Sequence, residues 1–215
     1  MLTDDSQQAA LVNLFHQGTR LVYEKGEFVI RPGGPPQGVF YILKGLVKAY
    51  DITKYGEENL LIIRKEHEIF PLIWAITGQE REIIYEAMAP TVVWRISPQT
   101  YLSFLHNHPA ALPPLLDMVT EMYRIHSERL LNLEYRTVRE RLISFLLTMS
   151  NRFGKQTEDG IVIEVPLRHQ DLASSINASR ETASREVSAL ERKGLISNKN
   201  SFIVLNDVDK LQEYL

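Results

Sequence analysis

The chain has 215 residues, 44% of them hydrophobic, which is enough for one large or two small domains with buried cores. Its formal net charge of −3 provides no general basic field, so binding to nucleic acid must depend on a local patch. Because cysteine is absent, disulfides, thiol switches, cysteine zinc sites and cysteine-ligated iron–sulfur clusters are excluded. The first residues, MLTDDSQQAA, are acidic and polar, and no stretch reaches the length of a membrane span. We therefore expect a cytoplasmic protein with no membrane partner.

The region from about residue 21 to residue 98 has the pattern of an all-β domain. Short runs of Val, Ile, Tyr and Leu alternate with turn signals such as RPGGPPQG, LKG and KYGEE. Strands of this length and spacing predict a β-barrel or jelly roll. Within it, VFYILKGLVKAYDI and NLLIIRKEHEIF are expected to pair antiparallel around a turn at Gly56.

The segment 112–153 is predicted to be a long helix. It has no glycine, and its prolines, Pro113 and Pro114, stand at the start, where a first helical turn tolerates them. Apolar residues recur in steps of four and three, which is typical of a coiled-coil seam. These apolar residues would either pack against a second copy of the helix or, alternatively, pack on the β domain of the same chain. The predicted dimer seam consists of Val119, Met122, His126, Leu130 and Leu133.

The third region begins after the turn-rich NRFGKQTEDG, with the strand-like IVIEV. HQDLASSI is expected to form a short helix, Asn177 and Ala178 a turn, and Ser179 the N-cap of a second helix. Two helices across a tight turn make a helix-turn-helix. After Gly194, the runs LIS and FIVL flank NKN and predict a β-hairpin wing.

The second helix of this pair has one apolar and one polar face. Ala183, Val187 and Leu190 follow helical spacing and should pack inward. The N-terminal residues of a recognition helix meet base edges, where arginine pairs with guanine and glutamate accepts from cytosine. We predict base contacts from Arg180, Glu181, Ser184 and Arg185, and phosphate contacts from Arg168, His169, Gln170, Ser179, Arg192 and Lys193. The alternatives are a winged helix that binds protein, or a charged face that is simply solvated.

These residues carry a family resemblance. SRETASREVSALERKGLIS resembles the recognition helix and wing of bacterial CRP/FNR transcription regulators, and YILKGLVKAY with GEENLL resembles their cyclic-nucleotide-binding-like barrel. In the catabolite-activator type, an arginine, a following glutamate and a second arginine read a TGTGA-like half-site; Arg180, Glu181 and Arg185 occupy the matching positions. RERLISFLLTMSNRFG is similar to the helix that joins the two domains in cyanobacterial nitrogen-control regulators. Their recognition helix differs, so their DNA target is not carried over.

The resemblance also identifies the segment that would hold cAMP, EIFPLIWAITGQEREIIYEA. Family members that bind cAMP have a Gly-Glu pair and an arginine followed by a small residue. Here Pro71 and Leu72 replace the pair, which removes an amide donor and a carboxylate, and Glu82 follows Arg81. We predict that cAMP does not bind and leave the effector, if there is one, unassigned; heme is not expected. The candidate effector pocket consists of Leu72, Arg81, Glu82, His126 and Ser127.

The predicted fold class is α+β. It comprises a cyclic-nucleotide-binding-like β-barrel or jelly roll at 1–111, a dimerisation helix at 112–136 and a winged helix-turn-helix DNA-binding domain at 137–215. The predicted function is a homodimeric regulator of a near-palindromic site, with or without an effector; contact with RNA polymerase through KQTEDG follows from the resemblance. No catalytic or metal residues are assigned. A cupin-type enzyme is disfavoured because the six histidines do not converge from barrel strands.

Overall fold

The computed structural model describes residues 5–199 and 202–215. The chain divides into two compact units. The first combines the chain up to Asp51 with Leu61–Tyr123, and the second combines Ile52–Leu60 with Arg124–Leu215.

The β domain predicted for the N-terminal half is confirmed. Its strands form two four-stranded sheets, in the orders β1-β8-β3-β6 and β2-β7-β4-β5, and neighbouring strands run antiparallel. The strands of the first sheet are β1 (Thr19–Tyr23), β8 (Thr91–Ile96), β3 (Val39–Lys44) and β6 (Ile69–Phe70). Those of the second are β2 (Phe28–Ile30), β7 (Ile84–Ala87), β4 (Val47–Ile52) and β5 (Glu58–Arg64).

The expected pairing of β4 with β5 around Gly56 is also present, and Gly56 has a φ of 78°. The preceding segment, VFYILKGLVKAYDI, contains two strands rather than one, since Gly45 separates β3 from β4. Gly45 has a φ of 103°, and a Cβ there would lie 2.5 Å from the Thr91 hydroxyl oxygen. Both the conformation and the close approach require glycine at this turn.

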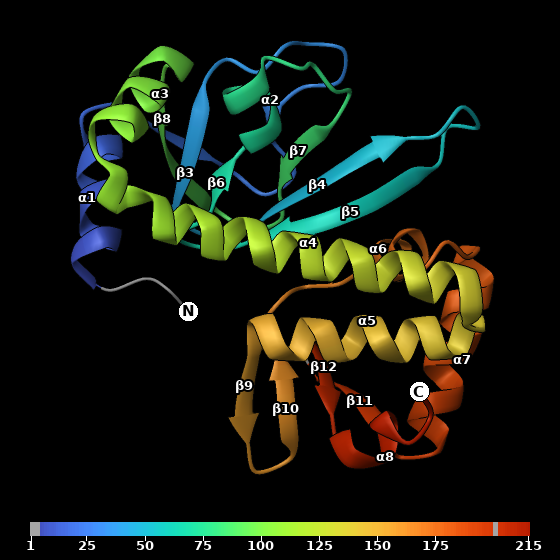
Figure 1. Ribbon diagram of the computed structural model, residues 1–215. Coiled ribbons are helices and arrows are strands. Elements are labelled where there is room, and N and C mark those ends of the chain that lie inside the picture. Colours follow the sequence, from blue (N-terminus) through green and yellow to red (C-terminus); the bar gives the residue numbers. More distant parts are fainter. Residues whose placement is uncertain (1–4, 200–201) are drawn as a thin grey trace. The chain divides into compact units, whose positions relative to one another are not determined.

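Helices cover part of the first unit (Figure 1). They are α1 (Asp5–His16), which the sequence analysis did not predict, α2 (Leu72–Thr77), α3 (Pro98–Asn107), a 3₁₀ turn (Pro109–Ala111) and the start of α4 (Leu112–Tyr135). Phe15 of α1 stacks on Tyr41 of β3 with ring centroids 5.3 Å apart, and Leu115 of α4 joins the same buried cluster. Met122 packs against this cluster from the next turns of α4.

A single helix over 112–153 is wrong, because α4 ends at Tyr135 and α5 (Val138–Phe153) begins anew. Thr137 is the N-cap of α5: its hydroxyl accepts a hydrogen bond from the Glu140 N–H at 3.4 Å, and the Glu140 carboxylate accepts one from the Thr137 N–H at 2.7 Å. This capping box satisfies backbone groups that a continuous helix would pair internally. The sequence TVRE carries its signature.

The second unit contains the winged helix-turn-helix. Its sheet has the order β11-β12-β10-β9, and α5 packs against β9, β10, α7 and α8 (Figure 1). The predicted wing is the hairpin of β11 and β12; of its expected turn NKN, Asn200 lies outside the described residues. The remaining elements are β9 (Gly154–Thr157), β10 (Gly160–Ile163), α6 (His169–Ser175), α7 (Arg180–Arg192), β11 (Ile196–Lys199), β12 (Phe202–Leu205) and α8 (Val208–Gln212).

Polar contacts join the C-terminal half of α4 to its surroundings in this unit. The buried Asn132 amide donates to the Ser144 hydroxyl of α5 at 2.7 Å, and Ser144 donates to Glu128 at 3.2 Å. The Arg129 guanidinium donates to the Asn59 side-chain oxygen at 2.6 Å and to the Ser174 carbonyl of α6 at 3.4 Å. The hairpin segment Ile52–Leu60, α4 and α6 are therefore linked within one unit.

Candidate nucleic-acid interface

The helix-turn-helix begins with α6, whose N-terminus is held by Asp171. Its buried carboxylate accepts from the Arg168 backbone N–H at 2.8 Å and from the Arg168 guanidinium at 3.1 and 3.2 Å. Arginine cannot accept a hydrogen bond from the free N–H groups of a helix. The carboxylate of the third helical residue instead fixes the N-cap residue itself, as the acidic half of a capping box does.

The turn between α6 and α7 has the conformation that its sequence favours. Asn177 has a φ of 50°, in the left-handed region that asparagine tolerates. The Ala178 N–H donates to the Ala173 carbonyl at 3.1 Å, and the Ser179 hydroxyl accepts from the Thr182 N–H at 3.2 Å as the N-cap of α7. Leu172, Ala173 and Ile176 are buried as predicted. The start of α7 is therefore fixed by local hydrogen bonds.

The two faces of α7 are separated as its sequence predicts. Ala183, Val187 and Leu190 are buried. Arg180, Glu181 and Arg185 are exposed, and Ser184 is half-buried between them and the apolar face. The structure thus brings three charged predicted base contacts together on the solvent side of the first turns of α7.

Glu181 is held in its ionised form. Hydrogen bonds from its own backbone N–H and from the Ser179 hydroxyl, together with the neighbouring Arg180 charge, lower the pKa of the Glu181 carboxyl. A carboxylate near the N-terminus of a helix is also favoured by the helix dipole. Near neutral pH this side chain is a hydrogen-bond acceptor, which is the property that recognition of the cytosine amino group requires.

The predicted phosphate contacts lie around the ends of α6 and α7. His169 is half-buried, and the other five side chains are exposed. Three are engaged within the protein: Arg168 pairs with Asp171, the Ser179 hydroxyl caps α7 by accepting from the Thr182 N–H, and the Lys193 ammonium donates to the Tyr214 hydroxyl at 2.8 Å. The members of this set are Arg168, His169, Gln170, Ser179, Arg192 and Lys193.

Sequence reasoning did not identify two contacts that position this interface. One is Asp171, which a D/E three residues after an expected N-cap could have indicated. The other is an ion pair in which the Arg139 Nε of α5 donates to Glu186 of α7 at 2.7 Å. These two residues are 47 positions apart, and no local pattern relates them.

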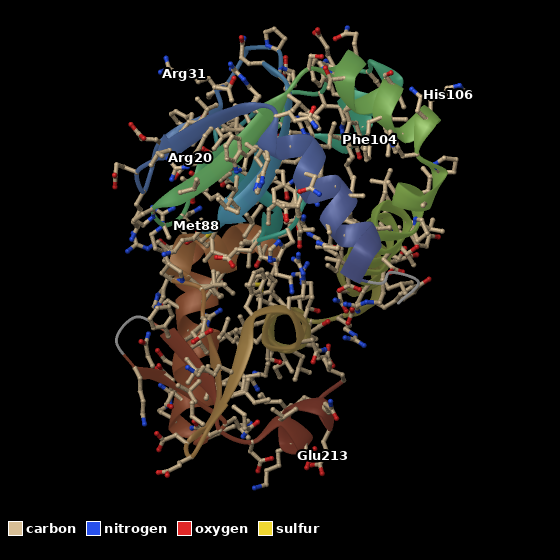
Figure 2. All side chains as sticks on the ribbon, turned by 90° about the vertical axis from the view of Figure 1, so that its left-hand side faces the viewer. Arg20, Arg31, Met88, Phe104, His106 and Glu213 are labelled. Atoms are coloured by element: carbon tan, nitrogen blue, oxygen red, sulfur yellow. The ribbon has the colours of Figure 1, made fainter. Side chains whose placement is uncertain are left out.

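The candidate effector residues have different environments. Leu72 is buried in the hydrophobic cluster of the first unit. Arg81 and Glu82 are exposed and line a cavity of about 300 Å³ together with Arg31 of the loop that follows β2. Of these three residues, Figure 2 labels Arg31. The other lining residues are Gly33, Gly34, Pro35, Pro36, Glu80 and Ile83. His126 and Ser127 lie on the part of α4 that belongs to the second unit.

The space between the sheets of the first unit contains stacked aromatic rings. Phe70 stacks on Phe40 with centroids 5.3 Å apart and on Tyr85 with centroids 4.7 Å apart. Burial raises the pKa of Tyr85, and the charges of Arg64 and Arg81 oppose this effect. The Tyr85 hydroxyl therefore stays neutral at physiological pH.

Within residues 5–199 and 202–215, no group of three or more His, Asp or Glu side chains is arranged to hold a metal ion. Figure 2 shows His106 at the outer end of α3, where it is exposed. The His108 ring contacts the Phe104 carbonyl oxygen at 3.1 Å. In the same described ranges, no helix combines the length and apolar character that a membrane crossing requires.

An antiparallel β domain, a long helix and a winged helix-turn-helix with an exposed charged recognition helix together define a DNA-binding transcription regulator. Comparison with known proteins supports this class for each part. Residues 140–214 match the Crp-like helix-turn-helix domain family, and residues 20–108 match the cyclic nucleotide-binding domain family.

Relatives match over most of the chain. The Global nitrogen regulator of Synechococcus elongatus is 30% identical over 200 residues, which cover 89% of this chain and 88% of that protein. Its counterpart from Nostoc sp. is 30% identical over 206 residues, with 89% and 90% covered. The protein belongs to the CRP/FNR family of transcription regulators, and its relatives are regulators rather than enzymes.

Solved structures show the same fold. A mutant of CooA from Carboxydothermus hydrogenoformans matches with a TM-score of 0.80 at 19% identity, covering 98% of this chain and 96% of that one. FixK2 from Bradyrhizobium japonicum matches with a TM-score of 0.77 at 22% identity, covering 91% and 96%. The arrangement of β domain, long helix and winged helix is thus common to proteins of low sequence identity.

Proposed function

We propose that this protein acts as a homodimer that binds a near-palindromic, TGTGA-like DNA site through Arg180, Glu181, Ser184 and Arg185. The observation that carries the proposal is the exposed Arg-Glu-Arg constellation on α7, opposite the buried Ala183 side. Arginine offers two donors to guanine, and an ionised glutamate accepts from cytosine, so these residues suit a half-site containing G·C pairs.

Homodimer formation is supported by exposed apolar side chains along α4. They are spaced as in a coiled-coil seam and include the proposed seam residues Val119, Leu130 and Leu133. Because Met122 packs against the core of its own unit, we add its exposed neighbour Tyr123 and, one turn before Val119, the exposed Leu116. Paired recognition helices would then meet half-sites about 34–36 Å apart.

We further propose that cAMP is not the effector. Leu72, which replaces the ribose-binding carboxylate, is committed to the hydrophobic core, and Glu82 places a negative charge next to Arg81 on the wall of the cavity. A carboxylate at that place would repel a phosphate. The regulator is then either controlled by another effector or competent to bind DNA without one. Action on DNA implies a cytoplasmic location. Contact with RNA polymerase through the KQTEDG turn, residues 155–160, follows from the family resemblance.

The test is selection of binding sites from a random DNA library by the purified full-length protein, with and without cAMP. Enrichment of the same near-palindrome in both arms is the expected result. Enrichment only with cAMP would overturn the effector proposal. If neither arm enriched a sequence, while the protein stayed folded and dimeric, binding without an effector would be excluded. An unknown effector would become the leading explanation, and a protein partner for the winged helix would gain support.

A further inference from the structure

The recognition helix is held on its protein side by an ion pair as well as by apolar contacts. Arg139 is the second residue of α5, and its Nε donates to Glu186 in the middle of α7 at 2.7 Å. The Glu186 side chain is only 15% exposed, whereas that of Arg139 is 40% exposed. The contact therefore lies at the edge of the packing between α5 and α7.

We propose that the Arg139–Glu186 ion pair is a positioning contact that determines the sequence specificity of the recognition helix. This inference rests on the proposed function. The ion pair fixes the rotation of α7 about its own axis, so that Arg180, Glu181 and Arg185 reach their bases together.

Apolar contacts alone control this rotation weakly. Ala183, Val187 and Leu190 form one buried stripe, and hydrophobic contact has no directional requirement. Side-chain ends on a helix lie about 6 Å from its axis, so a rotation of about 10° displaces them by about 1 Å. Hydrogen bonds to base edges weaken steeply over such a displacement. A directional hydrogen bond beside this buried stripe, such as that between Arg139 and Glu186, restrains the rotation of α7.

The pair has the placement that this task requires. Glu186 lies between Arg185, a proposed base contact, and the buried Val187, so an anchor there acts directly on the polar face. At its other end, Arg139 sits in the first turn of α5, which the Thr137–Glu140 capping box holds in register. A charge-assisted hydrogen bond between two such fixed points sets distance and direction at once. Partly exposed ion pairs add little to stability, so the contribution of this pair lies in orientation.

The ratio of the affinities for the selected site and for its variants distinguishes misorientation of α7 from a change in the net charge of the protein. Gain or loss of one charge on the protein alters its affinity for all DNA sequences alike, because it changes the electrostatic attraction to the DNA phosphates. Misorientation of α7 instead reduces discrimination between the selected site and its variants. It also differs from loss of one base contact: it relaxes several positions of the half-site together, whereas Arg180→Ala relaxes one.

The experiment measures the affinity of the full-length protein for the selected palindrome and for sites with one substituted base pair per half-site, at fixed salt. The discrimination ratio is the affinity for the selected palindrome divided by the affinity for a substituted site. We expect Glu186→Gln and Arg139→Gln each to lower this ratio about five- to twentyfold at two or more base positions. The exchanged pair, Arg139→Glu with Glu186→Arg, should recover most of that loss. Glu164→Gln is the matched control, since Glu164 pairs with Lys155 at 3.9 Å on the exposed surface of the same unit. Its ratio should equal that of the wild type.

Unchanged ratios in both single variants, or no recovery in the exchanged pair, would overturn the inference. Thermal unfolding of each variant separates misorientation from loss of fold. Should a single variant not fold, Arg139→Met with Glu186→Leu leaves no unpaired charge, and it must still show reduced discrimination if the pair positions α7. Failure of the wild type to select any palindrome would count against the proposed effector-independent binding and not against the ion pair, so the two failures are distinguishable.

Discussion

Arg180 and Lys193 stand at opposite ends of α7, and their surroundings predict different effects on DNA binding. Arg180 is exposed in the first turn, next to Glu181, whereas the Lys193 ammonium is held by the Tyr214 hydroxyl just beyond the last turn. Arg180→Ala should cost about 1–3 kcal/mol on the selected site and relax one base position. Lys193→Ala should weaken binding to all sequences alike and reduce the salt dependence.

Competition binding with selected and random DNA at several salt concentrations measures both effects. Equal losses on the two kinds of DNA for both variants would contradict the assignment of Arg180 to a base. Since the Lys193 side chain also contacts the Tyr214 ring, with 4.9 Å between the ammonium and the ring centroid, unfolding of that variant must be compared with the wild type.

At the scale of residues, the sequence predicts what is local. The 3.6-residue period places Ala183, Val187 and Leu190 inward and the charged side chains outward, as the structure has them. The Asn177 turn and the Ser179 cap are equally local. The Arg139–Glu186 pair joins two helices through tertiary packing, so the preferences of the two segments do not indicate it. A large part of the recognition surface was thus predictable, but not the contact that orients it.

At the scale of elements, the end of α4 and the start of α5 depend on Thr137 and Glu140. Thr137→Ala should reduce the free energy of unfolding by about 0.5–2 kcal/mol, because the Glu140 N–H loses its acceptor. Thermal or urea unfolding measures this change. Thr120→Ala is the matched control: Thr120 is exposed within α4, where alanine is the better helix former. An equal loss in the two variants would argue against the cap.

The same cap predicts a dependence on pH. Hydrogen bonds from the Thr137 hydroxyl and backbone N–H lower the pKa of Glu140 below its ordinary value of 4.5 in the folded chain. The carboxylate therefore stabilises the fold above that value, and the contribution is lost as the pH falls through the lowered folded-state pKa. Glu140→Gln should be less stable than the wild type near neutral pH, and the difference should shrink below about pH 4. A difference that grew on acidification would contradict the cap.

The break between α4 and α5 also illustrates why some elements escape prediction. Apolar spacing continues through the segment, and only the short TVRE signature marks the new N-terminus. The helix α1 has a comparable explanation, since Leu11, Leu14 and Phe15 become a core face only when they meet Tyr41 and Tyr101 of other elements. The pairing of β4 with β5 was easier to predict, because the turn at Gly56 bounds both strands directly, whereas the division between β3 and β4 at Gly45 was not predicted.

At the scale of the whole molecule, the exposed apolar stripe of α4 predicts that a second copy of the chain is needed for tight DNA binding. Leu116 is 53% and Leu130 65% exposed, and charged side chains at these positions would repel each other across a seam. Leu116→Glu combined with Leu130→Glu should therefore yield a folded monomer in sedimentation experiments. With only one recognition helix per molecule, its affinity for the palindrome should fall about 10²- to 10⁴-fold, towards that for a single half-site.

The matched control for this variant is Leu102→Glu, because Leu102 is 40% exposed on α3, away from the stripe. It should remain dimeric and bind the palindrome as the wild type does. If the doubly charged variant of α4 stayed dimeric, the proposed seam through Leu116 and Leu130 would be wrong. Met122, which was set aside because it packs against the core of its own unit, would then have to be tested again as a seam residue. If the wild type were itself monomeric but still selected a palindrome, dimerisation would occur on the DNA, and the affinity of the charged variant for that palindrome would still fall.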